Sequence, residues 1–383
     1  MAGRKSSRAI CVAALFVGAS ILGWGTPAAD PAEYDPDRPV VDLAICLDTS
    51  NSMERLLDAA RLELWNIVNE LALAEPTPRL RVALLTYGNA AHSRHDGWVK
   101  VESPLTEDLD SVYQRLFELT ARGREEYVGR VLEAAVKGLD WDESYDALKL
   151  IFVAGNEKAD QDPQVNFEHV TLEAKENDLI VNAIYCGNAG HNDADSWKKV
   201  AELAGSEFAA IDHRSLGATV ATPFDTELAE LSAAINATYV PLGDRGQQGQ
   251  QNQVQQDRNA ESLGPATVAS RAQAKSSPLY STDWDLLDQL QKGKTTLAEL
   301  DESELPEPMR QLTPDEREIY VEELTLRREQ LGQQIAELSR KRRAYVSDHS
   351  KAKGGDDSSS FGAVFRRTLV EKGKEKGLNF PDR

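Results

Sequence analysis

Apolar and polar positions alternate in a regular way between residues 40 and 237. The first apolar run, Val40–Leu47, is interrupted only by Asp42, which is typical of a strand buried on both faces of a sheet. Apolar residues then recur at helical spacing from Met53 to Leu73. The same patterns predict further strands at 79–87, 98–101, 148–154, 180–186 and 207–211, and helices at 107–120, 127–139, 164–177, 193–204 and 225–237. Strands that alternate with helices predict an α/β fold with a doubly wound, mostly parallel sheet and helices on both faces.

Small oxygen-bearing side chains follow the first predicted strand. Asp48, Ser50 and Ser52 stand at its carboxyl end, where open α/β sheets bind ligands. A carboxylate and two hydroxyls are hard oxygen ligands, so we expect Mg²⁺ or Mn²⁺ here before Ca²⁺. The simpler alternative is that these side chains only cap the helix that follows.

This D-x-S-x-S sequence, between a buried strand and an amphipathic helix, resembles the von Willebrand factor A (vWA) domain family. The resemblance covers roughly Arg38 to Leu242. It implies a Rossmann-like sheet and a metal-ion-dependent adhesion site that opens with Asp48, Ser50 and Ser52. In the family, the metal reaches a carboxylate of a partner protein through an open coordination position.

Two later segments depart from the family pattern. Where the family places a Thr in a Gly-rich loop, this chain has Glu125 or Glu126 near the same position. Where the family ends the next strand in Asp, this chain has Gly155, and Asn156 and Glu157 are the nearest side chains with oxygens. We therefore extend the candidate ligands by Glu126 and Asn156.

The departures leave two interpretations open. A Glu could restore an anionic cage for the cation and fill the position that the family keeps for its partner. Alternatively, Glu125 and Glu126 only begin the next helix, where the helix dipole favours anions, and the site is metal-free.

The first 29 residues have the composition of a signal peptide. Arg4, Lys5 and Arg8 precede an uncharged apolar run from 9 to 24, and Ala28-Ala29 ends the segment in small residues. We expect cleavage after Ala29 and export to a periplasm, the cell envelope or the medium, with a retained membrane anchor as the alternative. Residues 30–38 are a short polar linker before the domain predicted at 39–242.

The second half of the chain is expected to be helical. Residues 243–278 begin with a Gln-rich stretch that predicts a linker or a solvated helix, and residues 279–383 form a helical extension. Thr313, Pro314 and Glu316 form a capping box for a long helix at about 314–346.

The long helix carries an apolar seam interrupted by Arg328 and Arg342. The seam predicts either a coiled-coil dimer or a single charged helix with one apolar side. Its arginines would weaken a homodimer or select an acidic partner. After a flexible break at 354–360, a terminal helix at about 361–376 lies in a basic segment. That segment is expected to contact the acidic body of the protein or a membrane surface.

Charge and composition narrow the function. The 383-residue chain has a net charge of −20, which argues against a nucleic-acid binder. If the sheet is wound as in the family, a strand separates Cys46 from Cys186, so we expect two buried thiols and no disulfide. No motif proposes a catalytic reaction, and we expect no enzyme.

We expect an exported protein that binds other proteins through the top of its sheet with a divalent cation. The alternative is a metal-independent scaffold of the cell envelope that assembles through its C-terminal helices.

Overall fold

The structure, a computed structural model, describes residues 38–211, 220–352 and 361–381. The expected signal segment, nearly all of the linker at 30–38 and the break at 354–360 lie outside these residues. In the described residues, no helix is long and apolar enough to cross a membrane.

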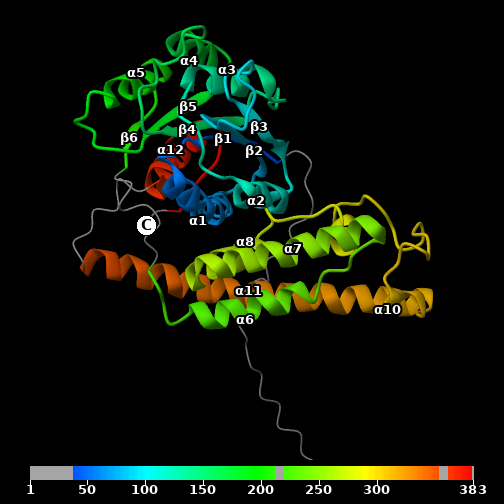
Figure 1. The fold of residues 1–383 in the computed structure, drawn as a ribbon. Helices are drawn as coiled ribbons and strands as arrows, with labels where there is room; N and C mark the ends of the chain where they lie inside the picture. The colour runs from blue at the N-terminus through cyan, green and yellow to red at the C-terminus, as the bar shows by residue number, and fades with distance from the viewer. Residues whose placement is uncertain (1–37, 212–219, 353–360, 382–383) are drawn as a thin grey trace, which may run out of the picture. The chain divides into compact units, whose positions relative to one another are not determined.

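A six-stranded sheet forms the centre of the sequence-predicted α/β domain (Figure 1). The strand order is β3-β2-β1-β4-β5-β6, and only β3 pairs in the antiparallel sense. The strands are β1 (Val40–Asp48), β2 (Arg79–Tyr87), β3 (Lys100–Thr106), β4 (Leu148–Gly155), β5 (Ile180–Tyr185) and β6 (Phe208–Ala210). The predicted mostly parallel, helix-covered sheet is confirmed. The third strand begins later than expected because Trp98 has a positive φ of 56° and still belongs to the turn.

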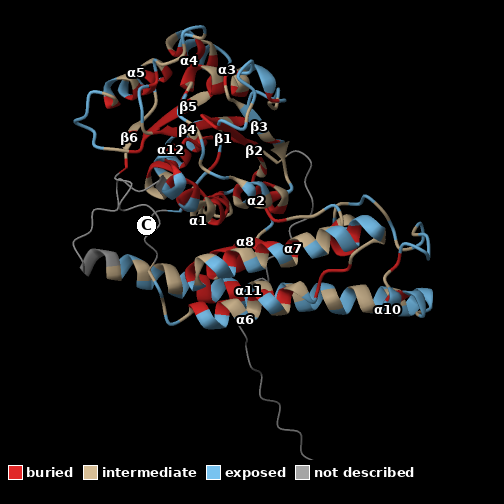
Figure 2. Ribbon diagram, viewed as in Figure 1, coloured by how far each residue is buried: buried red, intermediate tan, exposed pale blue. Residues whose placement is uncertain are grey.

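Helices cover both faces of the sheet. Along β1, Leu43 and Leu47 enter one apolar core, while Ala44 and Cys46 enter the other, so the strand is buried on both faces as predicted (Figure 2). The first core is covered by α1 (Glu54–Leu71) and α2 (Leu109–Glu118), and the second by α3 (Val128–Gly138), α4 (Phe167–Glu176) and α5 (Ala194–Ala204).

Cys46 and Cys186, the two cysteines among the residues that the structure describes, are buried free thiols, as expected. Cys46 lies in β1 and Cys186 directly follows β5, and β4 lies between these two strands. Burial raises the pKa of each thiol, so both remain protonated and unreactive.

The helix predicted at 225–237 forms, as α6 (Asp225–Asn236), but it does not pack on the sheet as the last helix of the domain predicted at 39–242. Its Leu228 and Ile235 pack instead against α8 (Pro265–Lys275) and α11 (Pro314–Ala352). The place beside α1 is taken by α12 (Phe361–Glu375), far along the chain (Figure 1). The amphipathic pattern gave α6 an apolar face but could not specify which neighbour covers it.

Phe365 anchors α12 in the first apolar core. Its ring centroid lies 4.9 Å from that of Phe152 in β4, and Leu369 is buried in the same core. The Thr368 hydroxyl donates to Asn182 Oδ1 of β5 at 2.9 Å. Beyond the helix, Asn379 and Glu75 exchange backbone hydrogen bonds of 2.8 and 2.9 Å. The end of the chain is therefore built into the sheet domain.

Basic side chains of the C-terminal segment form ion pairs within the chain. Arg366 pairs with Glu70, Arg367 with Glu207 at 3.0 Å, and Lys376 with Asp178 at 2.7 Å. Of the two expectations for the basic segment, contact with the acidic body is the one that the structure shows.

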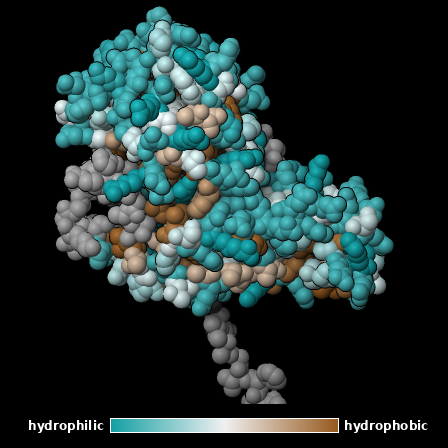
Figure 3. Space-filling model, in the orientation of Figure 1, coloured by the Kyte–Doolittle hydropathy of each residue, from teal (hydrophilic) through white to brown (hydrophobic). Residues whose placement is uncertain are grey.

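The Gln-rich stretch forms helix α7 (Gly243–Leu263), followed by α8, the short helices α9 (Leu286–Gln291) and α10 (Glu307–Arg310), and α11. Gln253 and Gln256 are fully buried, so the helix is not solvated on all sides. Gly249 allows close packing, because a Cβ there would lie 2.3 Å from the Trp284 ring. Figure 3 shows a largely hydrophilic surface over the sheet domain and more hydrophobic residues lower in the view.

Helix α11 begins at the predicted capping box. The Thr313 backbone N–H donates to Glu316 Oε2 at 2.8 Å, and the Glu316 N–H is 3.4 Å from the Thr313 hydroxyl. Leu331, Ile335 and Leu338 of the seam are buried against α6 and α8. The acidic partners of the seam arginines lie in the same chain, since Arg328 binds Asp285 and Asp288, and Arg342 binds Asp225. Within the chain, the apolar side of α11 is thus covered by its own neighbouring helices.

A buried ionic network joins the helical extension to the sheet domain. Arg271 of α8 contacts Asp110 of α2 at 2.6 Å and Asp257 of α7 at 2.5 Å. Its guanidinium lies 4.7 Å from the centroid of the Trp65 ring of α1. Lys275 adds a second cation, 3.0 Å from Asp257.

Candidate metal centre

The D-x-S-x-S loop lies between β1 and α1 at the carboxyl edge of the sheet. The Ser50 backbone N–H donates to Asp48 Oδ1 at 2.7 Å, and the Ser50 and Ser52 hydroxyl oxygens are 3.2 Å apart. The Ser52 hydroxyl donates to Asn156 Oδ1 at 3.3 Å. The residue that precedes α1 is Met53, and no side chain caps this helix terminus. The capping alternative is therefore wrong for these three side chains.

Backbone hydrogen bonds join this loop to the loop before α3. The Asn51 N–H donates to the Gly123 carbonyl at 3.2 Å, and the Gly123 N–H donates to Asn51 Oδ1 at 3.1 Å. The Arg122 N–H donates to the Thr49 carbonyl at 2.7 Å. Gly123 is required here, because its φ is +130° and a Cβ would lie 2.0 Å from the Gly88 carbonyl oxygen. These contacts fix the position of the loop so that Glu126 lies beside Asp48.

Asp48 and Glu126 form a pair of buried carboxyl groups within hydrogen-bonding reach of each other. Burial raises the pKa of Asp48, and burial together with the charge of Asp48 raises the pKa of Glu126. A hydrogen bond between two carboxyl groups needs a proton on one of them. With both ionised, Asp48 Oδ2 has no donor anywhere in the described part of the chain. The pair therefore requires a proton or a cation.

The residues present fit a divalent cation. Asp48, Ser50, Ser52, Glu126 and Asn156, the five predicted ligands, come together and all offer hard oxygen atoms. Across the described ranges, no group of three or more His, Cys, Asp or Glu could hold a metal. A cation at this edge would thus depend on the hydroxyl and amide oxygens as well as the two carboxylates.

Gly155 has no room for the acid that the family carries. A Cβ at Gly155 would lie 2.3 Å from the Tyr87 hydroxyl and 3.1 Å from the Trp197 ring. The Tyr87 hydroxyl is fixed by donation to the Ala154 carbonyl at 2.9 Å. The next residue, Asn156, places its Oδ1 beside Ser52, whereas Glu157 and Glu125 are exposed.

Sequence reasoning missed Gly88 and Tyr87, which shape the site from β2. Gly88 has a φ of +78°, and a Cβ there would lie 3.0 Å from Asp48 Oδ1 and 3.4 Å from Glu126 Cγ. The signal was a glycine at the carboxyl end of the predicted strand that adjoins β1. Its missing side chain leaves the space in which the two carboxyl groups meet.

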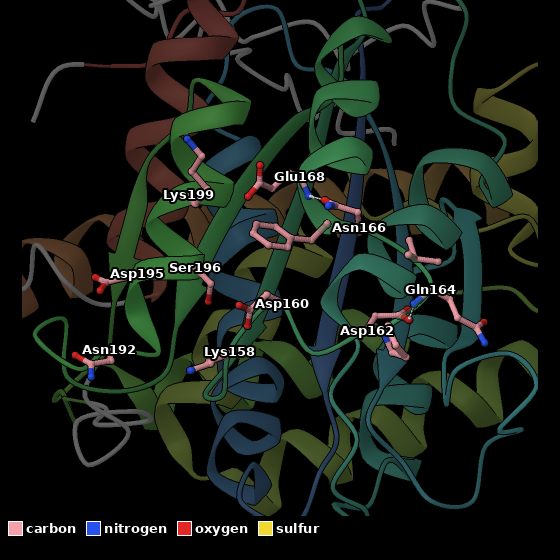
Figure 4. A pocket seen from close by; sticks show the side chains of 13 residues that line it. Lys158, Asp160, Asp162, Gln164, Asn166, Glu168, Asn192, Asp195, Ser196 and Lys199 are labelled. Carbon is pink, nitrogen blue, oxygen red and sulfur yellow. Dashed lines mark hydrogen bonds between the residues drawn. The ribbon is translucent and has the colours of Figure 1, made fainter.

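A polar cavity of about 490 Å³ lies near this edge (Figure 4). Its walls come from the connection that follows β4 and from the start of α5, with Lys158, Asp160 and Ser196 among the lining side chains. Figure 4 shows mixed charges and amides around the hollow, so the cavity does not by itself indicate a ligand.

Comparison with known proteins identifies the domain. The model of the family described as von Willebrand factor type A domain matches residues 42–215. The SpRpn10 VWA domain is a similar solved structure, with 17% identity over 45% of this chain and 88% of that chain and a TM-score of 0.33. A von Willebrand factor type A protein from Catenulispora acidiphila shows 17% identity over 47% of this chain and 40% of that chain, with a TM-score of 0.36.

A third similar structure is proximal thread matrix protein 1 from the mussel byssus, described with a zinc occupied MIDAS motif. It shows 15% identity over 47% of this chain and 43% of that chain, with a TM-score of 0.37. This chain thus matches less than half the length of the latter two proteins. No curated protein matches the chain. The sheet, its helices and the matching family model agree that residues 42–215 form a von Willebrand factor type A domain.

Proposed function

We propose that this protein binds another protein through the carboxyl edge of its sheet, with Mg²⁺ or Mn²⁺ held by Asp48, Ser50, Ser52, Glu126 and Asn156. VWA domains generally mediate protein–protein interaction and are generally not enzymes. The main support for a bound metal is that Asp48 Oδ2 has no hydrogen-bond partner among the described residues and lies beside a second buried carboxyl group. When bound, the cation supplies positive charge that balances this pair and attracts a carboxylate of the partner.

Glu126 distinguishes this site from the family pattern. Its carboxyl group is buried beside Asp48, and a Glu126 that binds the cation directly would fill the coordination position that the family keeps for a partner's carboxylate. We propose that the protein holds its cation firmly and captures its partner less strongly than a site with the Thr of the family.

We also propose that the protein acts outside the cytoplasm. The support is the basic, then apolar, then small-residue order of residues 1–29. The scaffold alternative has less support, because Leu331, Ile335 and Leu338, which would drive assembly through α11, are already buried within the chain.

A pull-down from an extract of the native source tests the proposal. Immobilised protein should retain a partner in Mg²⁺ or Mn²⁺ and release it in EDTA, and Asp48→Ala should retain none. Asp58→Ala is the matched control, since Asp58 lies on α1 with a side chain 54% exposed and away from the two carboxyl groups. A partner that is retained equally in EDTA and by Asp48→Ala would contradict cation-dependent binding.

A further inference from the structure

A second cavity, of about 560 Å³, lies where the sheet domain meets the helical extension. Its walls come from β2, the link between β3 and α2, the start of α7, and the segment from Tyr280 to Lys294. The cationic side chains in its lining are those of Arg79, Arg81, Arg245, Lys292 and Lys294. Such a gathering of cations is notable in a chain with a net charge of −20.

Two of the acidic residues in this lining are occupied elsewhere. The Asp108 carboxylate accepts hydrogen bonds from the backbone N–H and the hydroxyl of Ser111, at 3.1 and 2.5 Å, and thereby begins α2. Asp110 is buried and bound by Arg271 and by the Tyr280 hydroxyl. Neither carboxylate is needed to neutralise the cations of the cavity.

The other cations of the lining are paired with acids that differ in exposure. Arg81 is neutralised by the buried Asp42 through two hydrogen bonds of 2.7 and 2.5 Å. Arg79 contacts Glu107, which is 39% exposed, at 2.8 Å. Asp283, which faces Lys292 and Lys294, is 73% exposed. Exposed carboxylates of this kind hold cations weakly, because water screens the pair.

Lys292 and Arg245 are the least neutralised cations in the lining of the cavity. The Lys292 side chain is only 8% exposed, yet the acid paired with it is the exposed Asp283, 3.3 Å away. Arg245 is exposed on α7 and makes no ion pair with any residue that the structure describes. A buried ammonium group normally requires a close anionic partner.

We propose that this cavity binds a small polyanion that carries phosphate or several carboxylate groups. Its volume lies within the range of small-molecule sites, and Arg and Lys side chains are the usual ligands of such oxyanions. The ligand would contact Arg79 of the sheet domain together with Arg245 and Lys292 of the helical extension. It would therefore stabilise the contact between the two parts, independently of the metal centre.

Pyrophosphate and citrate are suitable probes, measured by calorimetric titration and by thermal unfolding of the full chain after a chelating resin has removed metal ions and without added EDTA. Both probes should bind with one site per chain and raise Tm, while NaCl of equal ionic strength should not. Arg245→Gln removes an exposed cation without a core contact and should weaken binding about tenfold, the loss of one hydrogen bond to a charged group. Lys292→Gln should weaken binding at least as much. Arg258→Gln, also exposed and on α7, should bind as the wild type does.

Three results would overturn the proposal. One is the absence of binding by either probe. Another is equal affinity in Arg245→Gln, Arg258→Gln and the wild type, which would show general attraction to surface cations only. The third is binding that Asp48→Ala abolishes, which would place the anion at the metal centre instead.

Discussion

At the scale of residues, the candidate metal centre depends on two carboxyl groups in one buried space. Asp48 could be predicted from the sequence, because it follows an apolar strand and begins D-x-S-x-S. Comparison with the family pattern left Glu125 and Glu126 one residue apart as alternatives, and the sequence held no feature that decided between them. The structure supplies the reason, because hydrogen bonds between Asn51 and Gly123 set the register of the second loop.

Replacement of Glu126 by Gln should separate the metal-free state from the metal-bound state. In EDTA, Glu126→Gln removes one buried carboxyl group and offers an N–H donor to Asp48 Oδ2, so it should raise the free energy of unfolding by about 1 kcal/mol. The same change should reduce or abolish the rise in Tm caused by Mg²⁺ or Mn²⁺. Thermal unfolding in EDTA and in each ion measures both effects.

The neighbouring Glu125→Gln is the control, because Glu125 is exposed. It should change neither the stability in EDTA nor the response to ions. If Glu126→Gln destabilises the protein in EDTA, the two carboxyl groups do not oppose each other.

Gly155→Asp restores the acid of the family but should not restore its site. A Cβ at this position would meet the Tyr87 hydroxyl at 2.3 Å, so we expect a loss of about 3 kcal/mol from overpacking. Urea unfolding measures the loss, and Asn156→Asp, at a partly exposed position, is the comparison. A stable Gly155→Asp protein with tighter ion binding would show that Tyr87 and Trp197 move aside easily.

At the scale of elements, the strands and most helices could be predicted because their patterns are local. The partners of α6 and α12 could not, since an apolar face does not specify which surface covers it. The two seam arginines, read as selecting an acidic partner, do bind acids, but those acids lie in the same chain. The local sequence pattern thus predicted that these arginines pair with acidic residues, but it did not show that those residues lie in the same chain.

The ionic network between α2, α7 and α8 should make stability depend on pH through Asp257. Burial alone would raise the pKa of Asp257, but the charges of Arg271 and Lys275 outweigh it and hold the pKa below its usual value. A lowered folded-state pKa contributes stability that is fully present above the usual pKa of about 4 and is lost as the pH falls through the folded-state value. Asp257→Asn should therefore cost about 3 kcal/mol at pH 7 and progressively less below about pH 4.

Urea unfolding of the wild type and of Asp257→Asn over this pH range checks the prediction. Glu261→Gln is the matched control, because Glu261 is exposed on the same helix. A difference between Asp257→Asn and the wild type that stays constant from pH 7 to pH 3 would mean that the carboxylate charge does not matter.

At the scale of the whole molecule, the last helix completes the first domain. The VWA match ends at residue 215, yet α12 covers the same face of the sheet as α1. Along the sequence, the helical extension is thus inserted between two parts of the sheet domain. Sequence boundaries could not show this, because the contact joins segments more than 200 residues apart, as the Phe152–Phe365 ring pair does.

Phe365→Ala should destabilise the sheet domain as a core substitution does. Phe365 is 1% exposed and packs on Phe152, so we expect a loss of about 3–5 kcal/mol. Val370→Ala, on the same helix at a residue 43% exposed, should cost under about 1 kcal/mol. Denaturant unfolding followed by tryptophan fluorescence compares them. Equal stability of the two variants would mean that α12 does not complete the domain.

The central claim is that Asp48 and its neighbours hold a divalent cation. The most direct measurement is the melting temperature of the protein in EDTA and in Mg²⁺, Mn²⁺ or Ca²⁺, beside Asp48→Ala. An ion at about a hundred times its dissociation constant should stabilise the wild type by about 2.7 kcal/mol and leave Asp48→Ala unchanged. No shift in the wild type with any of the three ions would contradict the claim.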